Sequence, residues 1–321
     1  MTLEQWKSIS TGRLHLLGSK RSLVTTAWMF AFLILSGCSG GSGGIGGDAS
    51  PSGGLSIATW GDSTTSGIGA IAGQSYPEQL QSITGRVVFN GGVSGQTSDQ
   101  IAARAGGSPA LLTFPDNTVP GSGPVTVAAQ STFLVTEEGP GPITGTIGAL
   151  HGTLSYQSGS NPVLVFARDD SGSAVSIPAQ SPFLPDTFGR EAYINVFWMG
   201  QSNFYETSQI LADIANSIGF LTTQKFIVLS ILNAQNEGVG TAPYNAIMQL
   251  NAQLARTYPN NYLDIRQILV NRYDPGNAQD QRDFANDTAP QSLRSDNDHL
   301  NQRGYGIVAQ EVADFINRQG W

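Results

Sequence analysis

The 321-residue chain has only one cysteine, Cys38, and this scarcity limits how the protein can be held together. The part that we expect to fold begins near Leu55 and contains no cysteine. Disulfide bonds and thiolate metal sites are therefore excluded there. Because 40% of all residues are hydrophobic, the chain can still bury a core large enough for one large or two modest domains.

Basic side chains are also scarce. The chain has 16 lysines and arginines against 24 acidic residues, a net charge of −8. Residues 1–37 hold four of the basic side chains and one of the acidic ones, so the remainder has 12 against 23, a net charge of −11. Such a surface repels nucleic acid and anionic lipid head groups. We therefore expect no nucleic-acid partner.

The N-terminal apolar run, Leu23 to Leu35, is too short and too poorly flanked for a membrane-spanning helix. Basic residues precede it and "LSGC" ends it at Cys38, which is typical of a secretory signal. "LSGC" resembles the lipobox of bacterial lipoproteins, in which the peptide is cut before the cysteine and the cysteine is acylated. The resemblance implies a signal peptide over 1–37 and a lipid anchor on Cys38. Ser39 in place of an aspartate favours the outer membrane and periplasm. The alternative is a stray cysteine in an ordinary signal.

Residues 38–54 are expected to form a tether. After the cysteine the sequence reads "SGGSGGIGGDASPSGG", which has almost no side chain that can bury area. It is not a phosphate-binding loop, because no strand precedes it and no Gly-Lys-Ser follows.

Strands and helices alternate on both sides of a central region. The strand "LSIATW" runs into a Gly-Asp-Ser turn, "RVVFNGG" follows, and "TSDQIAARAG" begins a helix. Alternation resumes with the strand "YINVFWMG" and ends in a helix whose apolar residues recur at i, i+3 and i+4. This pattern predicts a parallel α/β sheet over 55–105 and 191–321. The later elements are expected to be helices over 206–220 and 243–258 and strands over 225–232 and 261–268.

Residues 106–190 differ from both flanks. They are rich in glycine, proline, serine and threonine, and short β-rich pieces such as "STFLVTE", "ITGTIG" and "HGTLSYQ" recur at hairpin spacing. We expect a small β domain inserted into the α/β domain. Its aromatic residues either fill the core of that domain or form a platform on which sugars stack: Phe133, Tyr156, Phe166, Phe183 and Phe188.

Beyond the signal peptide only two histidines remain, His151 and His299, and this limits where a general base can lie. Asp296 precedes His299 by three residues, so its carboxylate can hold one ring nitrogen and leave the other to accept a proton from a serine. The alternative is a solvated acidic turn before a helix. His151 lacks a spaced cluster of ligands, so we expect a polar residue of a β hairpin and no metal site.

Two serines are candidate nucleophiles: Ser63 in "TWGDSTTSG" and Ser202 in "FWMGQSNF". Four blocks, "GDSTTSG", "NGGVSGQTS", "GQSN" and "DNDHLN", occur in the order and context of the four blocks of the SGNH (GDSL-type) hydrolases, which this chain resembles over Leu55 to Arg104 and Ala192 to Trp321. The resemblance implies a three-layer α/β/α, flavodoxin-like parallel sheet. It implies a serine esterase without a cofactor.

The resemblance also assigns roles to residues. Ser63 would attack an ester carbonyl, His299 would accept its proton, and Asp296 would orient the imidazole. The oxyanion hole would comprise the backbone N–H groups of Ser63 and Gly95 and a side-chain amide of the third block. In strict register Ser202 occupies the amide position and Asn203 the next one. We favour Asn203, because an amide N–H₂ has fixed geometry whereas a hydroxyl rotor must be held.

"GQSN" also resembles the nucleophile block of a sister group of carbohydrate acetylesterases, in which that serine attacks. If Ser202 were the nucleophile, only about 120 residues would remain for a complete domain, which is a tight fit. A glycine block follows Ser63 but not Ser202, and so the sequence favours Ser63.

We therefore expect an esterase that removes O-acetyl or other short acyl groups from a carbohydrate of the cell envelope, with the membrane reached only through the lipid anchor. SGNH enzymes that act on polysaccharide, including some phage tailspike acetylesterases, look similar in carrying a β-rich module. One alternative is a lipid or aryl ester hydrolase. Another is a non-catalytic envelope lipoprotein that binds glycan.

Overall fold

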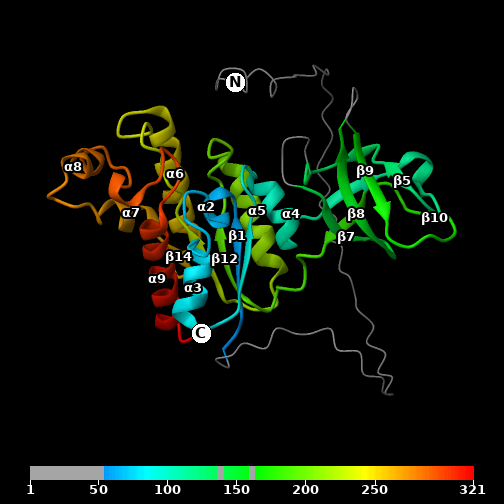
Figure 1. Cartoon of the computed structure of the whole chain (residues 1–321), viewed down its shortest axis with the longest axis horizontal. Coiled ribbons are helices and arrows are strands. Elements are labelled where there is room, and N and C mark those ends of the chain that lie inside the picture. Colours follow the sequence, from blue (N-terminus) through cyan, green and yellow to red (C-terminus); the bar gives the residue numbers. More distant parts are fainter. Residues whose placement is uncertain (1–53, 136–140, 159–162) are drawn as a thin grey trace. The chain divides into compact units, whose positions relative to one another are not determined.

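The computed structural model describes residues 54–135, 141–158 and 163–321 (Figure 1). The predicted signal peptide, Cys38 and all of the predicted tether except Gly54 lie outside the described residues. Within the described ranges, no helix has the length and apolar character needed to cross a membrane.

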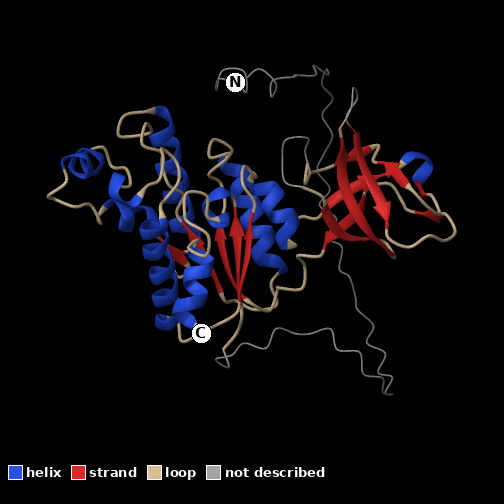
Figure 2. Ribbon diagram, in the orientation of Figure 1, coloured by secondary structure: helices blue, strands red, loops and turns tan. Residues whose placement is uncertain are grey.

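A five-stranded parallel sheet forms the centre of the α/β part (Figure 2). The strands lie in the order β14-β13-β12-β1-β2. Along the chain, β2 is added on one side of β1, and the next strand, β12, is added on the other side, so the order of addition reverses between β1 and β12. The predicted parallel α/β sheet is thus confirmed. Ligands bind such sheets outside the carboxyl ends of the strands, at the point of reversal. The strands are β1 (Ile57–Gly61), β2 (Val88–Gly92), β12 (Ile194–Trp198), β13 (Phe226–Leu229) and β14 (Tyr262–Leu263).

The helices of the α/β part pack in pairs. α3 contacts α9, where Gln79 Nε2 donates to the carbonyl of Gln302 at 2.9 Å, and α4 contacts α5. Leu80, Val308 and Val312 are buried, as the spacing of apolar residues predicts. The helices are α2 (Ser63–Ser66), α3 (Tyr76–Thr84), α4 (Ser98–Ala105), α5 (Thr207–Phe220), α6 (Ala242–Thr257), α7 (Ile265–Val270), α8 (Ala278–Ala285) and α9 (Gln302–Arg318).

The strand expected over 261–268 is wrong beyond its first residues. Only Tyr262 and Leu263 pair with β13, and α7 begins at Ile265. The carboxylate of Asp264 accepts a hydrogen bond from the backbone N–H of Gln267 at 3.1 Å, so this residue caps a helix that the apolar run alone does not announce.

Residues 110–185 contribute a second, seven-stranded sheet in the order β5-β9-β8-β7-β11-β3-β6, and every pairing in it is antiparallel. A strand is absent at "STFLVTE" as far as Val135, the last residue described there; Leu134 and Val135 are buried instead. The strands are β3 (Ala110–Thr113), β5 (Pro124–Thr126), β6 (Ala129–Gln130), β7 (Ile143–Ile147), β8 (Leu150–Gln157), β9 (Val163–Arg168) and β11 (Ser181–Pro185), and β4 (Thr118–Val119) pairs separately with β10 (Val175–Ser176).

Two of the aromatic residues considered for a sugar platform belong to the core of this sheet. Phe166 and Phe183 are fully buried, with ring centroids 6.3 Å apart. Phe133, in contrast, is 60% exposed. Tyr156 and Phe188 are half-buried. Two of the five residues therefore fill the core of this sheet, and Phe133 is exposed at the surface.

Candidate active site

Ser63 lies where β1 ends, at the carboxyl edge of the parallel sheet. Asp62 caps the short helix α2: its Oδ1 accepts hydrogen bonds from the backbone N–H and the hydroxyl of Thr64, at 3.1 and 2.9 Å. The turn therefore places the side chain of Ser63 immediately beyond the strand, where it is half-buried.

The structure brings together Ser63, His299 and Asp296, as the four blocks predict. His299 Nε2 lies 3.0 Å from Ser63 Oγ. On the other side of the ring, His299 Nδ1 lies 2.9 Å from Asp296 Oδ2 and 3.1 Å from Oδ1. This is the arrangement of a nucleophile, a base and a residue that orients the base.

The carboxylate of Asp296 also shapes its own turn. Its Oδ1 accepts hydrogen bonds from the backbone N–H groups of Asp298 and His299, at 2.8 and 2.7 Å. Burial raises the pKa of Asp296, but the hydrogen bonds from the His299 backbone and ring and from Asp298 outweigh it and hold the pKa below its ordinary value. Asp296 is therefore ionised at neutral pH. An ionised carboxylate requires a proton on Nδ1, which leaves Nε2 to accept one from Ser63.

A buried ion pair anchors the loop that carries this histidine. Arg294 Nη2 lies 2.9 Å from Asp283 Oδ2, with both side chains almost fully buried. Arg294 Nη1 also donates to the carbonyl of Asp296 at 3.1 Å. Around the loop, the N–H of Ser295 donates to the carbonyl of His299 at 2.9 Å. These contacts fix the histidine without using its ring.

The backbone donors of the predicted oxyanion hole lie on two adjoining turns. Gly95 adopts φ +77°, a left-handed conformation that favours glycine. Within the part of the chain that the structure describes, neither the N–H of Gly95 nor that of Ser63 donates to a protein acceptor. The two turns are joined where the N–H of Val93 donates to the carbonyl of Gly61 at 3.1 Å. Both N–H groups are thus free to bind an oxyanion.

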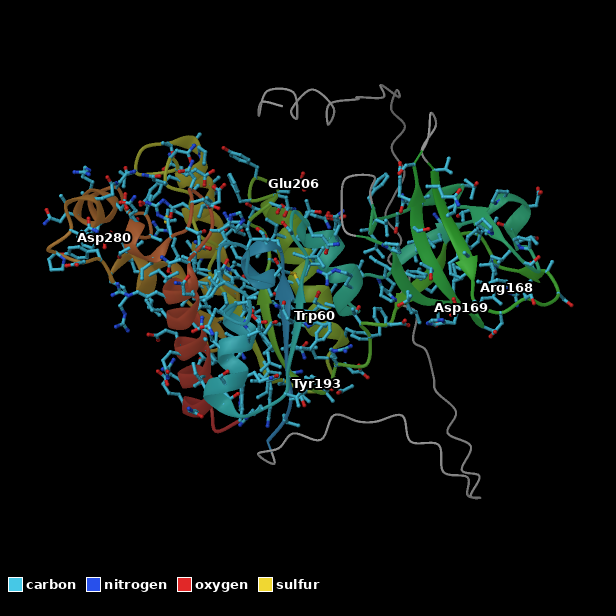
Figure 3. All side chains as sticks on the ribbon, in the orientation of Figure 1. Trp60, Arg168, Asp169, Tyr193, Glu206 and Asp280 are labelled. Carbon is cyan, nitrogen blue, oxygen red and sulfur yellow. The ribbon has the colours of Figure 1, made fainter. Side chains whose placement is uncertain are left out.

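Asn203 is held by the first turn of α4. Its Oδ1 accepts a hydrogen bond from the N–H of Ser98 at 3.2 Å, and its Nδ2 donates to Ser98 Oγ at 3.1 Å and to Glu206 Oε2 at 3.2 Å. Glu206 lies at the start of α5 (Figure 3). To reach an oxyanion, this amide must give up one of these partners, and the third donor stays a prediction.

Ser202, the rival nucleophile, is exposed, and its hydroxyl makes no hydrogen bond to any residue in the described ranges. The ring of His299 instead contacts Ser63 and Asp296. Next to Ser202, Gln201 Oε1 accepts a hydrogen bond from the N–H of Leu232 at 3.1 Å. The geometry thus pairs the imidazole of His299 with Ser63.

The sequence analysis missed a series of hydrogen-bonded side chains that continues from Asn203 through Ser98 to Asp213. Ser98 Oγ donates to Asp213 Oδ2 at 2.6 Å, and Gln209 Nε2 donates to Asp213 Oδ1 at 2.8 Å. Burial raises the pKa of Asp213. An aspartate on the apolar side of a predicted helix, one residue before Ile214, was the signal that could have revealed this chain.

His151, expected as a polar hairpin residue, lies between two carboxylates on the second sheet. Its Nδ1 lies 2.5 Å from Asp169 Oδ2, and its Nε2 lies 3.0 Å from Asp186 Oδ1. Asp169 lies just beyond β9 (Figure 3). The hydrogen bond to Asp169 makes the largest contribution to raising the pKa of His151, and the hydrogen bond to Asp186 makes the next largest. Across the described ranges, no group of histidine, cysteine, aspartate and glutamate is arranged to hold a metal ion.

The chain is similar in sequence to the tail spike protein of Salmonella phage epsilon15. The two are 27% identical over a 205-residue alignment that covers 55% of this chain. The match spans 19% of the length of the tail spike protein. No protein-family model matches the chain.

Several solved structures are similar. A lipolytic protein of the G-D-S-L family from Desulfitobacterium hafniense DCB-2 is 11% identical and covers 82% of this chain and 99% of its own, with a TM-score of 0.45. One from Veillonella parvula DSM 2008 is 12% identical and covers 83% and 100%, also at 0.45. AlinE4, an SGNH-hydrolase family esterase, is 13% identical and covers 65% and 75%, at 0.33. These neighbours carry the names of the family that the four sequence blocks resemble.

Proposed function

We propose that the protein is a serine esterase that hydrolyses O-acetyl or other short acyl esters on a carbohydrate. The observation that carries the proposal is the contact of 3.0 Å between His299 Nε2 and Ser63 Oγ, with Asp296 behind the ring. Hydroxyl, imidazole and carboxylate in this order form the unit that activates a serine in acyl transfer.

The reaction proceeds in two halves. Ser63 Oγ attacks the ester carbonyl carbon while His299 Nε2 takes the hydroxyl proton. The N–H groups of Ser63 and Gly95 then bind the negative oxygen of the tetrahedral intermediate. His299 passes its proton to the leaving alcohol, which departs and leaves an acyl-serine. A water molecule then attacks this ester, with His299 again as base, and releases the carboxylic acid and Ser63.

Exposed aromatic side chains support a carbohydrate as the substrate. Tyr205 is 64% exposed and its ring lies 4.5 Å from that of Phe204, in the loop that follows β12. The carbonyl of Phe133 accepts a hydrogen bond from Gln100 Nε2, in the first turn of α4. The backbone of Phe133 thus contacts the first turn of α4, and Asn203, two residues before Tyr205, contacts Ser98 in the same turn. Exposed aromatic faces beside a site are suited to stacking on sugar rings.

The chain is similar in sequence to a phage tail spike protein. Some tailspike acetylesterases look similar in carrying a β-rich module, and this resemblance supports the same substrate class. We further propose that residues 106–190 form a β domain inserted into a three-layer α/β/α domain. The antiparallel pairing of the second sheet supports the insertion, and the pairs α3–α9 and α4–α5 support two helical layers around the five parallel strands (Figure 1).

A lipid or aryl ester is the second candidate substrate. The N–H of Ile68 donates to the carbonyl of Ser63 at 3.0 Å, and both Ile68 and Ile71 are exposed, Ile71 by 64%. These side chains give the rim of the site an apolar edge that a long acyl chain can contact. Rates on p-nitrophenyl esters of increasing chain length separate the candidates, since a preference for acetate favours the carbohydrate ester and a preference for long chains favours the lipid.

The decisive experiment measures acetate released from an acetylated glycan by the wild-type protein and by Ser63→Ala. We expect release by the wild type only. Covalent labelling of Ser63 by a serine-directed phosphonate excludes a non-catalytic glycan-binding protein. Undiminished release by Ser63→Ala refutes the assignment of the nucleophile.

We also propose that the mature protein is anchored to a bacterial envelope through an acylated Cys38. The support is the lipobox-like "LSGC" and the Gly/Ser-rich tether that follows it. In cells fed a labelled fatty acid, we expect the label on the wild-type protein and none on Cys38→Ala. Equal labelling of both proteins contradicts this proposal and leaves the esterase proposal untouched.

A further inference from the structure

Arg104 is a buried arginine in the last turn of α4, only 3% exposed. Its Nε donates to Gln96 Oε1 at 2.6 Å, its Nη1 to the carbonyl of Gly91 at 2.7 Å and its Nη2 to the carbonyl of Gly61 at 3.4 Å. All three acceptors are uncharged. The sequence marks this residue only as an arginine among the apolar positions of "QIAARAG".

The three acceptors lie in or directly before the two turns of the candidate oxyanion hole: Gly61 ends β1, Gly91 lies near the end of β2, and Gln96 lies in the turn that follows β2. Long side chains on a helix point toward its N-terminus, so Arg104 reaches back from the end of α4 to the segments that precede the helix. Gly61 lies two residues before Ser63, and Gln96 directly follows Gly95. One planar guanidinium therefore ties together the backbone segments that carry the two N–H donors.

The charge of Arg104 is not neutralised locally. Among the described residues, no carboxylate forms an ion pair with Arg104, and burial alone lowers its pKa to about 10. Arg104 thus stays positive at neutral pH. Burying an unpaired charge is unfavourable, and the carbonyl oxygens compensate only part of the loss of hydration. A cost of this kind is typical of a site where a negative charge must be bound during a reaction.

We propose that Arg104 is a positioning residue for ester hydrolysis: it holds the N–H groups of Ser63 and Gly95 in register and directs positive charge toward the oxyanion that they bind. The inference rests on the proposed esterase function. It predicts that loss of the guanidinium acts on the transition state more than on the bound ester, because the carbonyl becomes an anion only during the reaction.

The test compares Arg104→Met and Arg104→Lys with Arg86→Met, using p-nitrophenyl acetate as the probe. Arg86 is a matched control, because it also donates to backbone carbonyls, those of Leu55 and Trp321, but precedes β2 at the other end of the strand. We expect Arg104→Met to lower kcat by roughly 100-fold, with KM changed less than about threefold, because small misplacements of reacting groups have effects of this size. Arg104→Lys should lose about tenfold. Arg86→Met should keep the wild-type kcat.

A phosphonate that mimics the tetrahedral intermediate separates positioning from general structural support. Its affinity should fall in parallel with kcat across the Arg104 variants, while KM stays near the wild-type value. If Arg104→Met does not fold, Arg104→Lys carries the test through the same two readouts. Wild-type kcat in a folded Arg104 variant overturns the inference, as does a rise in KM with unchanged kcat. Ser63→Ala is assayed in parallel: full activity in that variant overturns the role of Ser63 as nucleophile, and a wild-type protein without hydrolysis overturns the esterase function. Both results are distinct from either outcome at Arg104.

Discussion

His299 Nε2 lies 3.0 Å from Ser63 Oγ, although 236 positions separate the two residues in the chain. Ser63 begins α2, just beyond the end of β1, and His299 precedes α9. Packing of α9 against α3 brings these distant segments to the same edge. This contact is the basis for the proton transfer from Ser63 to His299 that we propose.

Removal of either partner of this contact should abolish turnover. We expect Ser63→Ala and His299→Ala each to lower kcat on p-nitrophenyl acetate by about 10⁴ to 10⁶. Because the two side chains act as one unit, the double variant should be no slower than the single ones. Initial rates with purified proteins test this, with Ser82→Ala on the exposed side of α3 as the control. Multiplicative losses in the double variant argue against a shared proton transfer.

Asp296→Asn should leave the fold intact and slow the reaction. The amide oxygen can still accept the backbone N–H groups of Asp298 and His299, but the amide cannot stabilise the imidazolium as the carboxylate does. We expect kcat to fall by about 10² to 10⁴, since the carboxylate is half-exposed and water can replace part of its effect. Because the pKa of Asp296 is held below its ordinary value, the wild-type carboxylate stays ionised to a lower pH than an unperturbed aspartate does. An unchanged kcat in the Asn variant removes Asp296 from the unit.

The third donor of the oxyanion hole can be assigned by a pair of variants. We expect Asn203→Ala to lower kcat by about 10² to 10³ and Ser202→Ala to stay near the wild-type rate. Ser98→Ala is the control for the structural part of the effect, because it removes the hydroxyl that accepts from Asn203 Nδ2 and keeps both the amide and the backbone N–H that binds Asn203 Oδ1. A large loss in Ser202→Ala with none in Asn203→Ala reverses the assignment.

Short sequence patterns predict the positions of Ser63, Asp296 and His299. They do not predict which polar residues are buried around the candidate site. A Gly-Asp-Ser turn after an apolar strand and an Asp-x-x-His turn are each written in a few neighbouring residues, and both form as expected. The partners of Arg104 and of Asp213 come from segments up to 115 positions away and depend on which polar groups the packing encloses. The periodicity of apolar residues predicts which face of a helix is buried, but not which polar side chains are buried on that face. The sequence did not reveal α7 for a different reason: its start is marked only by one capping carboxylate, Asp264, within an apolar run that is typical of a strand.

The buried carboxyl of Asp62 predicts a pH-dependent difference in stability. Asp62 is fully buried, and its Oδ2 has no hydrogen-bond partner among the described residues. Burial raises its pKa. The native state therefore binds the proton more tightly than the unfolded state, whose pKa is about 3.9. The stability that this proton contributes is complete below that pH and is lost as the pH rises through the folded pKa.

Asp62→Asn should be spared this loss, because the amide does not ionise and its oxygen can still accept from Thr64. The free energy of unfolding of the Asn variant minus that of the wild type should increase from pH 4 upward, by at most about 1.4 kcal/mol per pH unit. Urea unfolding at pH 4, 5.5 and 7 measures this difference. A difference that stays constant, or that shrinks with rising pH, contradicts a raised pKa at Asp62.

Gly92 should tolerate no side chain, because the end of β2 packs directly on the backbone of the helix that carries Ser63. A Cβ atom at Gly92 would lie 2.1 Å from the backbone N of Ser66 and 2.5 Å from the carbonyl carbon of Thr65, and neither can rotate away. We expect Gly92→Ala to lower the free energy of unfolding by about 1–3 kcal/mol, the range for inserting a group into a packed interior. Because α2 must shift to admit the methyl group, kcat should fall as well.

Gly219→Ala is the matched control for that substitution. Gly219 lies in α5, and a Cβ atom there meets nothing within 4 Å. Alanine in place of a helical glycine should raise the free energy of unfolding by about 0.5–1 kcal/mol and leave kcat unchanged. Urea unfolding and initial rates on both variants test the pair. If Gly92→Ala unfolds like the wild type and keeps its kcat, then β2 does not press on α2, and the close approach of the Ser63 and Gly95 turns must depend on Arg104 and on the Val93 to Gly61 hydrogen bond instead.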